Sequence, residues 1–115
     1  MSVVSFVVVG LGRIGKRHID VIRRISNAKL VAVCDVLPQE EFGLENLEVP
    51  FFSNIDDLLN SNINFDVVDI CTPNGFHAEQ AIKSLAKKYH VLLEKPMALT
   101  KLDAERIVNA SEQSS

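Results

Sequence analysis

The sequence predicts an α/β fold, in which helices cover both faces of a doubly wound parallel sheet to make a three-layer α/β/α domain. Three observations predict it. Short valine-rich apolar runs recur along the 115 residues without alternating with polar ones, as in strands buried on both faces. Segments with helical spacing separate these runs. A glycine-rich turn follows the first run. Right-handed crossovers then favour the strand order 3-2-1-4-5.

The expected elements alternate along the chain. The expected strands are Val3–Val9, Leu30–Cys34, a weaker Val49–Phe52, Val67–Cys71 and Val91–Leu93. Asp56–Asn60 has the pattern of a short helix, and a second helical stripe comprises Ala78, Ala81, Ile82 and Leu85. Thr100 followed by Asp103 is a capping box that opens a last helix.

The first helix carries an apolar stripe that we assign to Ile14, His18, Val21, Ile22 and Ile25. His18 follows the glycine-rich turn and could be drawn toward a ligand there. Because it falls on the apolar stripe, we expect instead a packed, hydrogen-bonded core histidine.

The composition indicates a single domain, covering residues 1–115, with a real core. Apolar residues make up 47% of the chain, and the net charge is −3, which argues against a nucleic-acid surface. No apolar run approaches the roughly 20 residues of a membrane span, and the N-terminus does not resemble a signal peptide. We therefore expect a cytoplasmic protein that binds neither nucleic acid nor membrane.

The two cysteines, Cys34 and Cys71, lack metal-ligand spacing, and no other His/Cys/Asp/Glu set has it. On strands 2 and 4 of the expected sheet they would lie roughly 10 Å apart, which is too far for a disulfide. We expect two buried thiols and no metal site.

The glycine-rich turn reads Gly10-Leu11-Gly12-Arg13-Ile14-Gly15, and its GxGxxG pattern opens a helix directly after a strand. This is the dinucleotide-binding fingerprint of Rossmann-type sheets. Gly10 would allow a tight turn, Gly12 would let a pyrophosphate approach the backbone, and Gly15 would let the helix pack closely. The alternative is an ordinary glycine-rich turn.

Asp35 ends the second expected strand about 20 residues beyond the glycines, where the fingerprint places an acid. It would accept hydrogen bonds from the adenosine ribose, or it is simply a turn residue. A carboxylate repels a 2′-phosphate, and no Arg or Lys follows it before Lys83. We therefore expect NAD in preference to NADP.

Two polar clusters follow the fourth and fifth strands. They comprise Thr72, Pro73, Asn74 and His77, and Glu94, Lys95 and Pro96. Both lie at carboxyl ends of strands, where ligands of open α/β sheets bind. Taken singly, Asn74 is a good helix N-cap, His77 a solvated first-turn residue and Lys95 a loop lysine. Their convergence favours a binding site.

The motifs GLGRIG, CTPN with His77, and EKP, together with Asp35, resemble the glucose–fructose oxidoreductase and inositol dehydrogenase (Gfo/Idh/MocA) family over nearly the whole chain. The stretch His90–Thr100 resembles members that act on sugars and nucleotide-linked sugars.

The resemblance implies a role for each matching residue. The residues that would contact the cofactor are Gly10, Gly12, Arg13, Ile14, Gly15, Asp35, Thr72, Pro73, Asn74, His77, Glu94, Lys95 and Pro96. Glu94 would hold the nicotinamide-side ribose, and Lys95 would be the catalytic lysine beside the hydride-transfer carbon.

The resemblance also implies that a C-terminal substrate domain is absent from this chain. We expect an NAD-dependent oxidoreductase acting on a sugar, polyol or nucleotide-sugar, with the 115-residue chain inactive alone and the full-length protein a homo-oligomer. The alternatives are a non-catalytic NAD- or nucleotide-binding regulatory module and a structural domain with a degenerate site.

Overall fold

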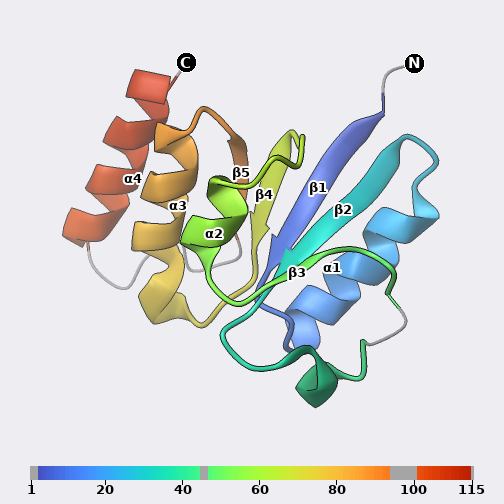
Figure 1. Ribbon diagram of the computed structural model, residues 1–115. Coiled ribbons are helices and arrows are strands. Elements are labelled where there is room, and N and C mark those ends of the chain that lie inside the picture. The colour runs from blue at the N-terminus through green and yellow to red at the C-terminus, as the bar shows by residue number, and fades with distance from the viewer. Residues whose placement is uncertain (1–2, 45–46, 94–100, 115) are drawn as a thin grey trace.

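The computed structural model describes residues 3–44, 47–93 and 101–114 (Figure 1). Its strands are β1 (Val4–Val9), β2 (Ala28–Cys34), β3 (Phe51–Phe52), β4 (Val67–Ile70) and β5 (His90–Leu93). Its α-helices are α1 (Arg13–Arg24), α2 (Ile55–Leu59), α3 (His77–Ala86) and α4 (Lys101–Ser114), with short 3-10 turns at η1 (Gln39–Phe42) and η2 (Asn74–Phe76). Glu94, Lys95 and Pro96, and the expected capping residue Thr100, lie outside the described residues.

The five strands form one parallel sheet in the order β3-β2-β1-β4-β5, which confirms the prediction. The register aligns the carboxyl ends of neighbouring strands. Val9 of β1 pairs with Cys34 of β2 and with Ile70 of β4, and Ile70 in turn pairs with Leu93 of β5. The segments that follow these strands therefore leave the sheet along one edge.

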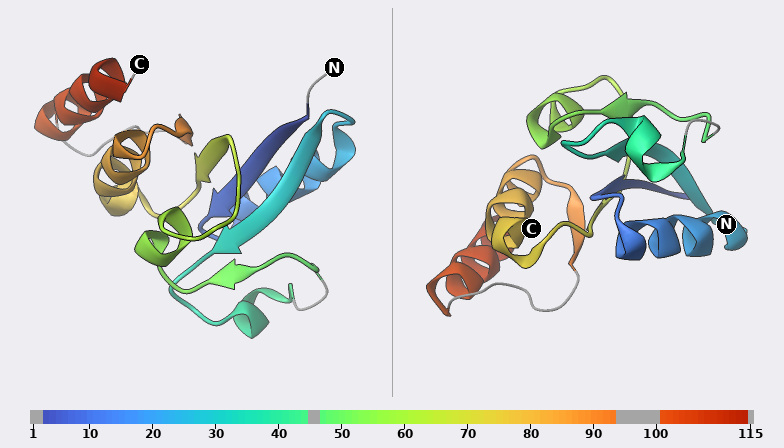
Figure 2. Two further views of the ribbon diagram at one scale, coloured as in Figure 1. Left: turned by 45° about the horizontal axis from the view of Figure 1, so that its top comes forward. Right: turned by 90° about the horizontal axis from the view of Figure 1, so that it is seen from below.

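Successive side chains of β1 enter two different cores. Val7 and Val9 pack with residues of α2 and α3, such as Leu58 and Ala81, on one face of the sheet. Val8 packs with Ile19 and Ile22 of α1 on the other. Figure 2 shows α1 and α2 on opposite sides of the strands, so the three-layer α/β/α arrangement is confirmed.

The apolar stripe predicted for the first helix is wrong in part. The buried face of α1 comprises Gly15, Ile19 and Ile22. Ile14, Val21 and Ile25 are 39%, 48% and 46% exposed. Gly15 sets this face because it lies directly against the end of β1, and the positions four and seven residues later then point the same way.

The remaining predicted elements lie close to their expected places. The stripe on α3 is confirmed, with Ala78, Ala81 and Leu85 buried. The helix α2 begins one residue earlier than expected because Asn54 caps it, its Oδ1 accepting the N–H of Asp57 at 2.8 Å. The weak third strand contracts to two residues at the edge of the sheet.

Within the described parts of the chain, no helix is both long and apolar enough to cross a membrane.

The corrected face of α1 predicts a contrast in stability. Ile19→Ala removes a side chain that is 2% exposed, and we expect the free energy of unfolding to fall by about 2–4 kcal/mol. Val21→Ala on the exposed face is the control and should change it by less than about 0.5 kcal/mol. Urea denaturation measures both. Equal losses would show that Val21, as first predicted, faces the core.

Candidate cofactor site

A pocket of about 530 Å³ lies at the carboxyl edge of the sheet, above β1, β2 and β4. It brings together seven of the residues predicted to bind a cofactor, namely Gly10, Gly12, Arg13, Ile14, Asp35, Thr72 and Pro73. These residues come from three separate segments. The aligned strand ends are what place the three segments side by side.

Gly10 occupies a position that no other residue type fits. Its φ of 97° lies in the left-handed region that side chains rarely adopt. A Cβ there would also lie 2.7 Å from the carbonyl carbon of Cys71 and 2.7 Å from the nitrogen of Thr72. The first glycine therefore makes the turn out of β1 and lets it contact the backbone after β4.

The other two glycines serve different purposes. A Cβ on Gly15 would overlap the carbonyl oxygen of Gly10, so this glycine lets α1 pack tightly against the turn. A Cβ on Gly12 would meet nothing within 4 Å. Folding alone therefore does not require a glycine at position 12. Its open side lines the pocket, which is where a ligand would approach the backbone.

The N-terminus of α1 points its polar backbone at this open side. The helix begins at Arg13, and its N-cap Gly12 makes no side-chain capping hydrogen bond. The first turn of a helix has N–H groups without intrahelical acceptors and carries a partial positive charge. With Arg13 exposed beside it, this end of α1 suits an anion such as a phosphate.

Asp35 connects the end of β2 to the glycine-rich turn. Its Oδ2 accepts the N–H of Leu11 at 2.8 Å, and its Oδ1 accepts the N–H of Leu37 at 3.0 Å. These bonds hold the carboxylate at the wall of the pocket. A carboxylate oxygen has more than one acceptor site, so both oxygens retain capacity for the hydroxyls of a ligand.

The segment after β4 is held in place by hydrogen bonds between two side chains of α3 and Thr72. His77 is 1% exposed, and its Nε2 lies 2.7 Å from the carbonyl oxygen of Thr72, to which it donates. The hydroxyl of Thr72 donates to the side-chain oxygen of Gln80. His77 is thus a buried brace rather than a solvated residue, and it lies behind the pocket wall that Thr72 and Pro73 form.

The lining of the pocket does not test four further predicted residues, namely Asn74, Glu94, Lys95 and Pro96. Asn74 begins η2, and the N-cap of α3 is Phe76 rather than Asn74. The predicted trio Glu94, Lys95 and Pro96 lies outside the described residues. β5 ends at Leu93 beside Ile70, so the chain leaves the sheet there at the edge that carries the pocket.

The apolar walls of the pocket were not predicted from the sequence. They come from Val36, Leu37, Phe42 and Phe76, with Asn54 and Gln80 adding polar groups. Val36, Leu37 and Phe76 are 82%, 53% and 57% exposed. Large exposed apolar side chains beside a pocket suit the flat face of a bound ring. The only sequence signal was the pair Val36-Leu37 directly after Asp35.

The two cysteines differ, although both were predicted to be buried. Neither forms a disulfide, as expected. Both line the pocket, but Cys34 is buried, whereas Cys71 is only half-buried. Cys71 is less buried because it lies one residue beyond the end of β4.

Comparison with known proteins places these features in a family. A model described as an oxidoreductase family with an NAD-binding Rossmann fold, GFO_IDH_MocA, matches residues 4–115. Glucose-6-phosphate 3-dehydrogenase of Bacillus subtilis (strain 168) is 32% identical over 107 residues, which cover 92% of this chain and 30% of that protein. The scyllo-inositol 2-dehydrogenase (NADP(+)) IolU of the same strain is 29% identical and covers 95% and 34% respectively.

The fold similarity is equally extensive. The crystal structure of the WlbA dehydrogenase from Bordetella pertussis, in complex with NADH and UDP-GlcNAcA, superposes with a TM-score of 0.90 at 36% identity. The match covers 97% of this chain and 35% of that one. The chain thus spans about a third of the length of the relatives it matches.

The environment of Cys34 predicts its reactivity. Burial, with smaller contributions from the carboxylates of Asp35 and Asp57, raises the pKa of the Cys34 thiol to about 12. In a Cys71→Ser variant, where Cys34 is the remaining thiol, we expect no measurable alkylation by iodoacetamide at about pH 8, because almost no thiolate is present. Mass spectrometry measures the adduct.

The same variant unfolded in guanidinium is the control and should be alkylated as fast as a free cysteine. Rapid alkylation of the folded variant would contradict the burial of Cys34.

Proposed function

Because the chain belongs to the Gfo/Idh/MocA oxidoreductase family, as the match over residues 4–115 shows, we propose that it is the cofactor-binding part of an enzyme that transfers a hydride between NAD and a sugar, polyol or nucleotide-sugar. One observation carries the proposal. The pocket combines an open glycine turn, a helix N-terminus and a carboxylate, which are the three elements that dinucleotide recognition needs.

Each part of a dinucleotide has a matching part of the pocket. The pyrophosphate would lie on the N-terminus of α1, over the open side of Gly12 and beside Arg13. The adenosine ribose would donate its hydroxyls to Asp35. The adenine ring would lie against the apolar wall formed by Val36, Leu37 and Phe42.

The choice of NAD over NADP rests on Asp35. Its carboxylate already accepts two backbone N–H groups and lies at the pocket wall, so a 2′-phosphate would meet a fixed negative charge. One relative has NADP(+) in its name, which shows that family membership alone does not decide the cofactor.

The nicotinamide half would lie toward Thr72, Pro73 and Asn74, with His77 holding this segment from behind. The cofactor supplies the hydride chemistry when bound. Lys95, within the EKP motif that follows β5, would stand beside the substrate oxygen, where a cation stabilises a developing alkoxide. Glu94 would hold the nearer ribose, and Pro96 would contact the cofactor beside them.

The class of substrate is supported by the relatives. The relatives reported above are described with glucose 6-phosphate, scyllo-inositol and UDP-GlcNAcA, and each of these compounds contains a hydroxyl-rich ring. We therefore propose a sugar, polyol or nucleotide-sugar whose CH–OH group is oxidised or whose ketone is reduced, and a homo-oligomeric whole enzyme.

The role of Asp35 predicts a change in cofactor preference. Asp35→Asn removes the negative charge but keeps an oxygen that can accept the N–H of Leu11. We expect NADH to bind roughly 10-fold more weakly, because charge-assisted hydrogen bonds to the ribose are lost. We expect the preference for NADH over NADPH to shrink by a similar factor. Titration followed by NADH and NADPH fluorescence measures both.

Asp20→Asn, an exposed change of the same charge on α1, is the matched control and should bind like the wild type. Wild-type chain that is folded by circular dichroism and yet binds neither nucleotide would overturn the proposed function. Equal binding of NADH and NADPH by the wild type would overturn only the choice of NAD.

The placement of Lys95 predicts a dependence on the oxidation state of the cofactor. The nicotinamide ring is cationic in NAD⁺ and neutral in NADH, so a nearby ammonium should weaken NAD⁺ selectively. Two unit charges about 4 Å apart in water-like surroundings repel by about 1 kcal/mol. Lys95→Met should therefore lower the ratio of the NAD⁺ and NADH dissociation constants about five-fold, as measured by calorimetric titration.

Lys87→Met, at the end of α3 remote from the pocket, is the control. The affinity for ADP-ribose, which lacks the nicotinamide, should stay the same in all three proteins. If the ratio of the NAD⁺ and NADH dissociation constants is unchanged in Lys95→Met, Lys95 does not lie beside the nicotinamide. That result would favour a non-catalytic nucleotide sensor, which has no need of a cation there.

A further inference from the structure

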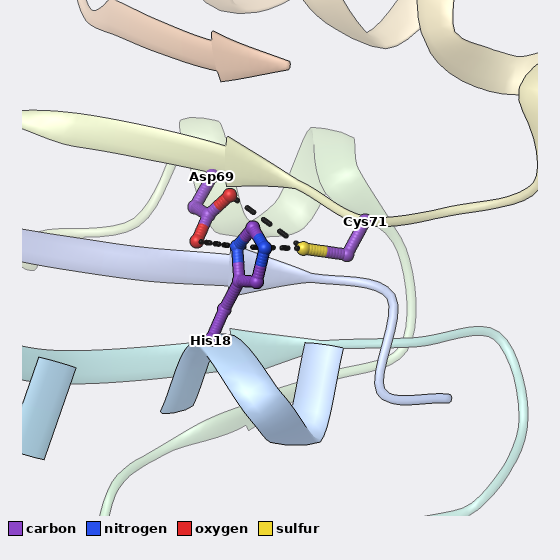
Figure 3. Close-up of side chains that lie close together, drawn as sticks. All are labelled: His18, Asp69 and Cys71. Carbon is purple, nitrogen blue, oxygen red and sulfur yellow. Dashed lines mark hydrogen bonds and ion pairs between the residues drawn. The ribbon is translucent and has the colours of Figure 1, made fainter. Parts of the chain in front are cut away.

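Three side chains with metal-ligating atoms meet on the face of the sheet that α1 covers. His18 comes from α1, Asp69 from β4 and Cys71 from the residue after β4 (Figure 3). His18 Nδ1 lies 2.7 Å from Asp69 Oδ2 and 3.3 Å from Cys71 Sγ. Cys71 Sγ lies 3.5 Å from Asp69 Oδ1. The expectation of a hydrogen-bonded His18 is confirmed, but its partners were not foreseen.

The cluster is largely withdrawn from water. The side chain of Asp69 is 1% exposed and that of His18 is 20% exposed. Burying a carboxylate is costly unless a positive charge or several hydrogen-bond donors compensate it. Here an imidazole and a thiol both face Asp69. The thiol can exchange its proton for a metal ion, and the imidazole can bind one through Nδ1 with its proton on Nε2.

We propose that His18, Asp69 and Cys71 form a binding site for a divalent transition-metal ion, with Zn²⁺ the best match. Zn²⁺ binds thiolate sulfur, imidazole nitrogen and carboxylate oxygen, and three protein ligands plus one water is a common arrangement. One ligand of each kind is present. Among the described residues, this is the one set of three such groups whose ligand atoms all lie within 4.8 Å of one another.

The distances require little movement. A tetrahedral Zn²⁺ with bonds of about 2.0–2.3 Å holds its ligand atoms about 3.4–3.6 Å apart. The contacts of Cys71 Sγ at 3.3 Å and 3.5 Å already match this spacing closely. The 2.7 Å contact between His18 Nδ1 and Asp69 Oδ2 has to lengthen by roughly 0.7 Å, or Asp69 can present Oδ1 instead.

The charges also balance. Coordination would release the thiol proton of Cys71 to the buffer. His18 would bind through Nδ1 with its proton on Nε2, because thiolate and neutral imidazole are the ligating forms. The thiolate and the carboxylate together then neutralise the two positive charges of the ion. Bound Zn²⁺ would join α1 to the end of β4.

The site borders the candidate cofactor pocket without depending on it. Cys71 lines that pocket, whereas His18 and Asp69 do not. The prediction of no metal site rested on local sequence spacing. His18 lies 51 and 53 residues from its two partners, so only the packing of α1 against the sheet brings the ligands together.

A zinc titration of the untagged chain tests the proposal. The protein is reduced with a phosphine, because thiol reductants bind zinc, and Zn²⁺ is added in competition with a chromophoric chelator. We expect one ion per chain, with Cys71→Ser and His18→Gln each weakening binding by more than about 100-fold. The matched control Cys34→Ser, which alters the other thiol, should bind like the wild type.

Cobalt substitution gives a second measurement. Co²⁺ should produce a thiolate-to-metal charge-transfer band that is absent from Cys71→Ser and present in Cys34→Ser, with circular dichroism showing that both variants are folded. If Cys71→Ser does not fold, the wild type and Cys34→Ser still test the proposal. Both should show the thiolate-to-metal band and bind one ion per chain. Absence of stoichiometric binding, or binding that survives loss of Cys71 or His18, would overturn the proposal.

Discussion

The close approach of two backbones at the carboxyl edge of the sheet supports the rest of the structure. Gly10 lies against the peptide group that joins Cys71 to Thr72, where even a Cβ atom would come within 2.7 Å of the backbone. Gly15 then lies against the carbonyl group of Gly10. These two contacts exclude side chains, so β4, the turn after β1 and α1 are held in direct contact. The N-terminus of α1 consequently opens onto the pocket rather than into the core.

The electrostatics of the pocket follow from that arrangement. Its centre has the partial positive charge of a helix N-terminus, while its far wall carries the carboxylate of Asp35, which the N–H groups of Leu11 and Leu37 hold in place. A ligand that fits has an anionic middle and neutral hydroxyl groups at one end. Apolar side chains beyond Asp35 favour a flat ring at that end. A dinucleotide meets these requirements together.

The two thiols illustrate how position along a strand determines chemistry. Cys34 is the last residue of β2 and lies within the core beneath α2, where burial keeps it protonated. Cys71 lies one residue beyond the end of β4, and its sulfur contacts both His18 and Asp69. The first behaves as an apolar side chain, whereas the second belongs to a polar cluster with ligating atoms.

The sequence by itself determined the strand order, the glycine turn and the position of Asp35. Buried strands require unbroken apolar runs, and a turn at positive φ requires glycine, so both leave local marks. Only the tertiary structure decided which face of α1 is buried, that His77 braces the site from behind, and that Val36, Phe42 and Phe76 form the pocket walls. The meeting of His18, Asp69 and Cys71 also belongs to this second group. These features depend on contacts between residues far apart in the chain, and such contacts leave no periodic or spacing signal in the sequence.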